Sequence, residues 1–135
     1  MPVTGAADIP PPVRVVVVDD NAPFRSVLRR LLDREPDIVV VGEAATGGQA
    51  LEQVATAQPD LVLMDVSMPE LDGIAATTRM KELHPDLPVV LLSVGSKSQE
   101  IAAGLESGAS EYLVKGASAA TIVGAVRRHG RRGEE

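Results

Sequence analysis

One stretch of this chain, residues 61–73 with the sequence Leu-Val-Leu-Met-Asp-Val-Ser-Met-Pro-Glu-Leu-Asp-Gly, limits the fold more than any other. Its first four residues are apolar, which is typical of a strand buried on both faces of a parallel sheet. Pro69 and Gly73 then indicate a loop, so Asp65 is predicted to lie where the strand leaves the core. A carboxylate in that position is either an ordinary loop cap or a functional group held on a rigid strand.

The same pattern, an apolar run that ends in a polar residue, recurs along the chain. Three further runs end in this way: 13–18 in Asp19 and Asp20, 89–92 in Ser93, and 112–114 in Lys115. Residues 38–41 form one more apolar run, and apolar residues between the runs recur with the helical period. The predicted helices lie between the cap Asn21 and Pro36, between 47–48 and Pro59, and over 73–83, 98–107 and 118–129.

Five strands that alternate with five helices predict an α/β domain with a parallel sheet and right-handed crossovers. Periodicity does not fix the order of the strands. The commonest arrangement at this size is the three-layer, flavodoxin-like (βα)5 fold with strand order 2-1-3-4-5. We expect this domain over residues 13–129, with a disordered Pro-rich tail over 1–12 and a C-terminal tail over 130–135.

Composition excludes several classes of protein. The 135 residues, 44% of them hydrophobic, suffice for the core of one ordinary domain. The sequence has no Cys, which excludes disulfides and suits a cytoplasmic protein. It shows neither an apolar run of about 20 residues, as a transmembrane helix needs, nor a signal-peptide pattern. The net charge of −6 argues against non-specific binding to nucleic acid.

The polar residues at the strand ends are expected to meet, because the carboxyl ends of parallel strands share one edge of the sheet. In the order 2-1-3-4-5 ligands bind between the first and third strands, where Asp19, Asp20 and Asp65 would converge. Three carboxylates this close repel one another, and a hard cation such as Mg²⁺ relieves the repulsion. With Ser93 and Lys115 beside them, they predict phosphoryl transfer to a carboxylate.

Two other functions use similar elements. An aspartyl-phosphate hydrolase of the haloacid dehalogenase type also combines Asp with Mg²⁺ on an α/β sheet. Its nucleophile follows the first strand in an Asp-x-Asp pattern, whereas Asp19 and Asp20 are adjacent. A flavin-binding electron carrier needs a phosphate-binding loop after the first strand, where these two acids would repel phosphate. A phosphorylation-controlled signalling switch is therefore the preferred function.

Four motifs resemble the response-regulator receiver domain of two-component signalling. They are Val17-Val18-Asp19-Asp20-Asn21, the stretch from Met64 to Gly73, Leu91-Leu92-Ser93, and Tyr112-Leu113-Val114-Lys115. The resemblance covers about 13–129. It implies that Asp65 is the phosphoacceptor and that the donor is a histidine kinase or a phosphotransfer protein. It also implies a Mg²⁺ site formed by Asp20, Asp65 and the Ser67 carbonyl, with Asp19 acting through water.

The resemblance also assigns the residues that respond to phosphorylation. It implies that Lys115 contacts the phosphoryl group, that Ser93 is the switch hydroxyl, and that Tyr112 is the aromatic switch. The signal would leave through the surface formed by 98–107, 112–114 and 118–129. Such a domain phosphorylates and dephosphorylates itself and is not a turnover enzyme.

Residues 24–44 look like the NarL/FixJ subfamily, whose members usually carry a helix-turn-helix output domain after the receiver. We therefore expect a stand-alone receiver, or one separated from its output domain, that acts on a downstream protein or on a second copy of itself. DNA binding by this chain is not expected. Two positions depart from the family: Gly116 stands where many receivers have Pro, and Val94, in place of a smaller Ala, would narrow the entrance to the phosphoryl site.

Overall fold

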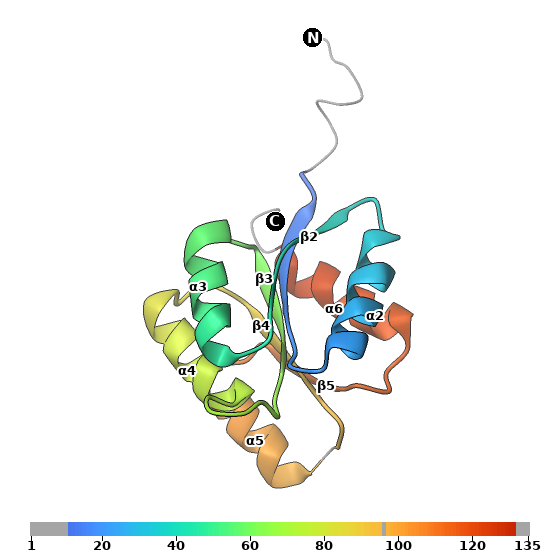
Figure 1. Cartoon of the computed structure of the whole chain (residues 1–135). Coiled ribbons are helices and arrows are strands. Elements are labelled where there is room, and N and C mark those ends of the chain that lie inside the picture. Colours follow the sequence, from blue (N-terminus) through green and yellow to red (C-terminus); the bar gives the residue numbers. More distant parts are fainter. Residues whose placement is uncertain (1–10, 96, 132–135) are drawn as a thin grey trace, which may run out of the picture.

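The computed structural model describes residues 11–95 and 97–131. In this part of the chain, five strands alternate with five helices (Figure 1). In chain order they are β1 (Val13–Val18), α2 (Ala22–Asp33), β2 (Ile38–Ala44), α3 (Gly47–Ala57), β3 (Leu61–Asp65), α4 (Gly73–Leu83), β4 (Val89–Ser93), α5 (Ser98–Glu106), β5 (Glu111–Val114) and α6 (Ala119–Gly130). Of the tails predicted over 1–12 and 130–135, residues 1–10 and 132–135 lie outside the described residues. Among the described helices, none combines the length and hydropathy of a membrane span.

The five strands form one parallel sheet in the order β2-β1-β3-β4-β5, which confirms the predicted fold. Helices α2 and α6 cover one face of the sheet, and α3, α4 and α5 cover the other (Figure 1). The chain changes direction across the sheet between β1 and β3. The carboxyl ends of these two neighbouring strands therefore border the crevice in which open α/β sheets bind ligands.

The central strands are buried on both faces, as their almost entirely apolar sequences predict. In β1, Val15 and Val17 pack into the core beneath α2 and α6, whereas Val16 and Val18 pack into the core beneath α3 and α4. Every residue of β3 and β4 is also buried. Since well-packed cores resist displacement, the carboxyl ends of these strands are rigid supports for the residues they carry.

Strand β2 is longer than predicted, because it continues from Val41 to Ala44. Its pairing with β1 is irregular: Val15 lies opposite Val40 and Val16 opposite Gly42, so that Val41 is an extra residue. The bulge leaves Val41 without a partner in the register, and pairing then continues to Ala44, which lies opposite Val18. The sequence alone gave no sign of it, and the predicted strand stopped where the apolar run stopped.

The helix ends differ slightly from the predicted ones. Helix α6 includes Gly130, which was expected to end it, and Arg131 then forms an ion pair with Asp37. The cap of α5 is Ser107, and Gly108 follows with a φ of 108°, a backbone conformation that suits glycine. Val27 of α2 is apolar but 50% exposed, so it lies at the edge of the buried face of this helix.

Gly73 allows the loop after β3 to fold back against the strand. Its backbone N–H donates to the Val66 carbonyl at 2.8 Å, and α4 starts at this residue. A Cβ on Gly73 would lie only 2.1 Å from the carbonyl oxygen of Asp65. The close approach therefore excludes any side chain at this position while the loop keeps its path.

We expect Gly73→Ala to lower the free energy of unfolding by about 2 kcal/mol or more, because the new methyl group must displace backbone. The control is Gly124→Ala in α6, where an added Cβ meets nothing within 4 Å. That variant should gain about 0.5–1 kcal/mol from helix propensity. Urea unfolding measures both, and a Gly73→Ala variant as stable as the wild type would contradict the steric explanation.

Candidate functional site

The structure brings the three predicted carboxylates together at the carboxyl edge of the sheet. Oxygen atoms of Asp19, Asp20 and Asp65 all lie within 4.8 Å of one another. Asp19 and Asp65 are only 1% and 3% exposed, whereas Asp20 is exposed. The convergence predicted from the strand ends is thus confirmed, with two acids buried and one facing outward.

Lys115, directly after β5, reaches into this cluster. Its Nζ lies 2.9 Å from Asp19 Oδ2 and 3.4 Å from Asp65 Oδ1. The same ammonium lies 4.7 Å from the centroid of the Phe24 ring, a distance at which the ring face attracts a cation. Burial acts to lower the pKa of Lys115, but the hydrogen bond to Asp19 and the charges of both carboxylates outweigh it and raise the pKa.

The positive charge of Lys115 does not balance the carboxylates that lie together at Asp65. Burial and then the charge of Asp19 raise its pKa from the ordinary 3.8 to about 6, although Lys115 and the Ser67 N–H act in the opposite direction. That N–H donates to Asp65 Oδ1 at 3.3 Å. The structure therefore places Ser67 next to Asp65, while the role of its carbonyl as a metal ligand stays a prediction.

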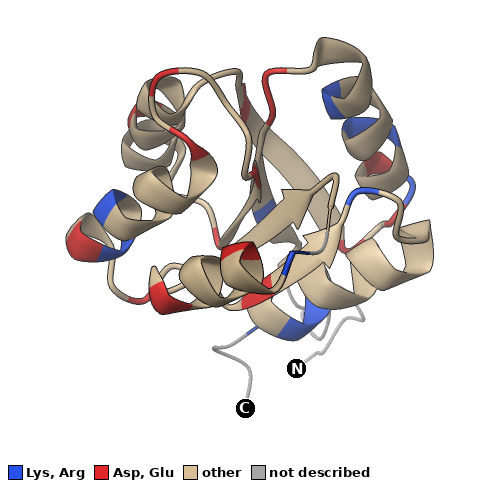
Figure 2. Ribbon diagram, turned by 90° about the horizontal axis from the view of Figure 1, so that it is seen from below, with Lys and Arg blue, Asp and Glu red and all other residues tan. Residues whose placement is uncertain are grey.

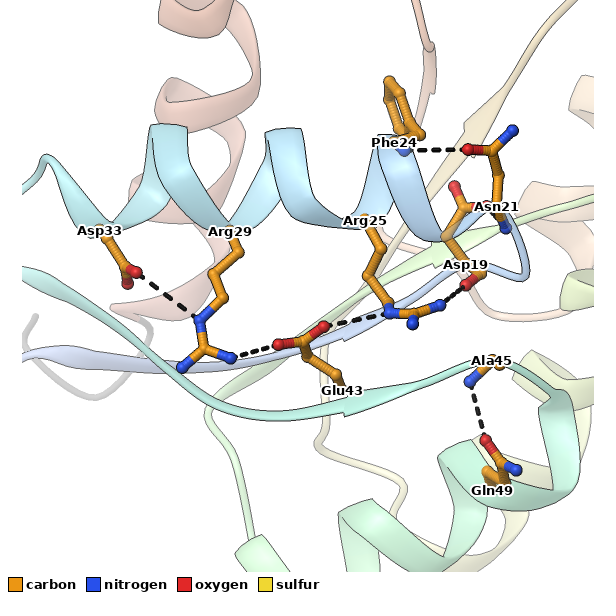
Figure 3. A network of polar contacts seen from close by, with 9 residues as sticks. All are labelled: Asp19, Asn21, Phe24, Arg25, Arg29, Asp33, Glu43, Ala45 and Gln49. Atoms are coloured by element: carbon orange, nitrogen blue, oxygen red, sulfur yellow. Dashed lines mark hydrogen bonds and ion pairs between the residues drawn. The ribbon is translucent and has the colours of Figure 1, made fainter.

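The backbone at Asp19 is held by an arginine that the sequence did not single out. Arg25 donates to the Asp19 carbonyl at 2.5 Å and to Glu43 Oε1 at 3.0 Å (Figure 3). Glu43 also pairs with Arg29, which in turn lies 3.7 Å from Asp33 (Figure 3). This ladder between α2 and β2 fixes the corner that carries Asp19 and Asp20. Periodicity placed the arginines on the polar face of α2 but could not name Glu43.

Ser93 and Tyr112 share a partner that was also missed, Glu100 in the first turn of α5. Ser93 Oγ donates to Glu100 Oε1 at 3.0 Å, and the Tyr112 hydroxyl donates to the same oxygen at 2.6 Å. The hydrogen bonds from Tyr112 and then from Ser93 lower the pKa of Glu100. Ser93 is also tied to the lysine, since Lys115 N–H donates to the Ser93 carbonyl at 2.7 Å.

Gly116, one of the two departures from the family pattern, does not disturb this arrangement. None of the peptide bonds in the described residues is cis, and Lys115 reaches both carboxylates although Gly116 replaces Pro. Val94 is 83% exposed, and its narrowing of the entrance stays a prediction.

The residues present fit Mg²⁺. Carboxylate oxygens are ligands that this cation prefers, and it usually keeps several waters, which the exposed side of Asp20 leaves room for. The buried Asp19 Oδ2 has Lys115 Nζ beside it and no other hydrogen-bond donor within the described residues. A single ammonium does not balance three carboxylates, so a divalent cation would remove the repulsion that raises the pKa of Asp65.

Replacing Asp65 by Asn should raise the free energy of unfolding at pH 7 by about 1–2 kcal/mol in buffer free of divalent cations. The neutral amide removes a buried charge and its repulsion by Asp19, and losing the pairing with Lys115 offsets part of this gain. Thermal or urea unfolding measures the difference, and Asp86→Asn, an exposed acid away from the cluster, is the control.

The stability that Asp65→Asn gains over the wild type should increase as the pH rises. The pKa of Asp65 is about 6 in the folded protein and 3.8 ordinarily, so the folded state binds the proton more tightly. The advantage of Asn should be full above about pH 6 and should disappear as the pH falls toward 4. A pH-independent difference between Asp65→Asn and the wild type would contradict the raised pKa.

Comparisons with known proteins agree with this geometry. The family model of the response regulator receiver domain matches residues 15–127. Response regulator protein VraR of Staphylococcus epidermidis is 38% identical over 116 residues, which are 86% of this chain and 56% of VraR. This chain spans about half the length of the curated relatives it matches.

Solved structures give the same result. The signal receiver domain of NarL from Mycobacterium tuberculosis has a TM-score of 0.87 at 34% identity, covering 93% of this chain and 100% of that one. A chain of the CheX–CheY–BeF3–Mg²⁺ complex from Borrelia burgdorferi has a TM-score of 0.83 at 26% identity, covering 90% and 92%. These matches decide against the hydrolase and the flavin carrier: this chain belongs to the response regulator receiver domain family, and its relatives are NarL-like regulators.

Proposed function

We propose that this receiver is a phosphorylation-controlled switch in which Asp65 accepts a phosphoryl group from a histidine kinase or a phosphotransfer protein. One observation carries the proposal: a buried carboxylate at the end of β3 lies beside two further acids and 3.4 Å from the Lys115 ammonium. An oxygen of Asp65 would bond to phosphorus as the bond to the donor breaks, and the donor would keep the electron pair.

The neighbours of Asp65 can stabilise the charge of the transferred group. Lys115 already contacts Asp65 Oδ1, so a phosphoryl oxygen bonded to Asp65 would lie within its reach. Ser93 ends the neighbouring strand β4, one residue beyond Leu92, which pairs with Asp65. In this proposal its hydroxyl donates to another phosphoryl oxygen once Asp65 is phosphorylated. Hydrolysis at Asp65 would return the protein to its resting state, so it is a self-resetting switch and not a turnover enzyme.

In the proposed site, Asp20, Asp65 and the Ser67 carbonyl hold Mg²⁺ directly, and Asp19 holds it through water. The bound cation would neutralise charge on the phosphoryl oxygens. The related CheX–CheY–BeF3–Mg²⁺ complex from Borrelia burgdorferi supports a Mg²⁺ site in this proposal.

The output surface in this proposal is formed by α5, β5 and α6, with Ser93 and Tyr112 as the switch residues. Relatives such as VraR are about twice as long as the match. The receiver would therefore act through a helix-turn-helix output domain, a separate downstream protein or a second copy of itself. The domain would not bind DNA, because the net charge of the chain is −6 and acidic and basic segments are interspersed in the view of Figure 2.

Incubation with Mg²⁺ and a small phosphodonor should give the wild type one phosphoryl adduct that is stable in acid and labile in base. Intact-mass analysis should find this adduct in the control Asp86→Asn and not in Asp65→Asn, which lacks the nucleophilic oxygen. The same amount of adduct at the same position in Asp65→Asn would overturn the assignment.

Asp20→Ala should weaken Mg²⁺ binding by about ten-fold or more, because one of the charged ligands is lost. Amide chemical shifts followed during a Mg²⁺ titration measure the affinity, and Asp86→Ala, which removes an acid outside the cluster, should bind as the wild type does. If Asp20→Ala and the wild type bind equally well, Asp20 is not a ligand.

A further inference from the structure

A single carboxylate oxygen of Glu100 links the end of β4 to the side chain of Tyr112. Oε1 accepts from Ser93 Oγ at 3.0 Å and from the Tyr112 hydroxyl at 2.6 Å. Glu100 lies in the first turn of α5, and the N-cap residue of this helix, Lys97, makes no side-chain capping bond. The two hydrogen bonds of the Glu100 carboxylate therefore connect α5 to β4 and to β5.

Helix α5 is shaped to receive the tyrosine ring. One turn after Glu100 lies Gly104, which is buried, and an added Cβ there would come within 3.0 Å of Tyr112 Cδ2 and of Leu91 Cδ1. Because Gly104 has no side chain, the Tyr112 ring can pack against α5, while Glu100 accepts the hydrogen bond of the Tyr112 hydroxyl. Two residues four positions apart on one helix therefore fix both ends of Tyr112.

The hydroxyl of Ser93 has one proton to donate, and in this arrangement Glu100 receives it. Ser93 Oγ also accepts from the Gly95 N–H at 3.3 Å, a bond that uses a lone pair and leaves the single proton engaged with Glu100. Donation to a phosphoryl oxygen on Asp65 therefore requires that the bond to Glu100 break. The two acceptors compete for one hydrogen.

We infer that Glu100 is a positioning residue that holds Ser93 and Tyr112 in the resting arrangement and keeps the Ser93 hydroxyl from the phosphoryl group. The inference rests on the proposed phosphorylation of Asp65 and adds its regulation. Phosphorylation releases Ser93 from Glu100, so the shared oxygen no longer holds Tyr112 together with Ser93, and the Tyr112 side chain can then change its position on α5. Loss of Glu100 favours the activated arrangement without phosphorylation.

The test compares Glu100→Ala with Glu106→Ala, which removes the same charge from the exposed last turn of the same helix. The probe is beryllofluoride with Mg²⁺, and the readout is its affinity followed by amide chemical shifts. Glu100→Ala should bind about three- to ten-fold more tightly than the wild type, as expected when one competing hydrogen bond is removed. Glu106→Ala should bind as the wild type does. Glu100→Gln keeps an acceptor oxygen without the charge and should lie between wild type and Glu100→Ala.

A second readout needs no phosphoryl mimic. Tyr112 is the only tyrosine of the chain, so its ring signals are unambiguous once this residue type is labelled. In resting Glu100→Ala they should move toward the positions they take in wild type with beryllofluoride, and in Glu106→Ala they should stay.

Unchanged or weaker binding by Glu100→Ala, or unchanged ring signals, would overturn the inference while the proposed function stands. If the wild type and every variant fail to bind beryllofluoride, the proposed function fails, and the inference fails with it.

Discussion

The arrangement of charges at the carboxyl edge of the sheet depends on the ion pairs of Lys115 with Asp19 and Asp65. Burying a carboxylate costs several kcal/mol unless it is paired, and here one ammonium serves two buried acids, with Asp20 close by. The compensation is incomplete, because the pKa of Asp65 remains raised to about 6. The folded protein therefore holds an excess of negative charge in place. In the proposed function this excess would attract a divalent cation, and Lys115 and the cation together would neutralise the transferred group.

A repulsive cluster persists only if the surrounding structure prevents its members from separating. Residues of β1 and β3 are packed on both faces, so Asp65 cannot withdraw without disturbing two hydrophobic cores. The close packing of Gly73 against Asp65 fixes the path of the loop that follows β3. Arg25, itself paired with Glu43, donates to the Asp19 carbonyl and so restrains the backbone there. The stability of the core thus offsets the electrostatic cost of the site, which is a common distribution of strain in functional proteins.

The sequence predicted those parts of the protein that depend on local pattern. Apolar runs located the strands, and the rule that parallel strands share a carboxyl edge brought Asp19, Asp20, Asp65, Ser93 and Lys115 together. It did not predict contacts between side chains of separate elements. Arg25 meets Glu43 because β2 extends beyond its apolar run and is shifted by a bulge at Val41. Glu100 contacts Tyr112 because Gly104 lets the ring approach α5. The periodicity of apolar residues does not predict such a contact between two elements.

The energy available at Ser93 limits how the switch can work. One hydrogen bond contributes about 0.5–1.5 kcal/mol net, which changes an equilibrium by roughly two- to twelve-fold. Full conversion between two states needs about 5.5 kcal/mol of differential binding, so the Ser93 proton cannot supply it alone. In the proposed switch, the remainder would come from contacts formed only after phosphorylation, above all those of Lys115 with the new charge. Ser93 is buried beside Asp65, whereas Glu100 and Tyr112 are half-buried. In that scheme the interior would supply most of the energy, and the weaker bonds near the surface would convert it into a change that a partner can detect.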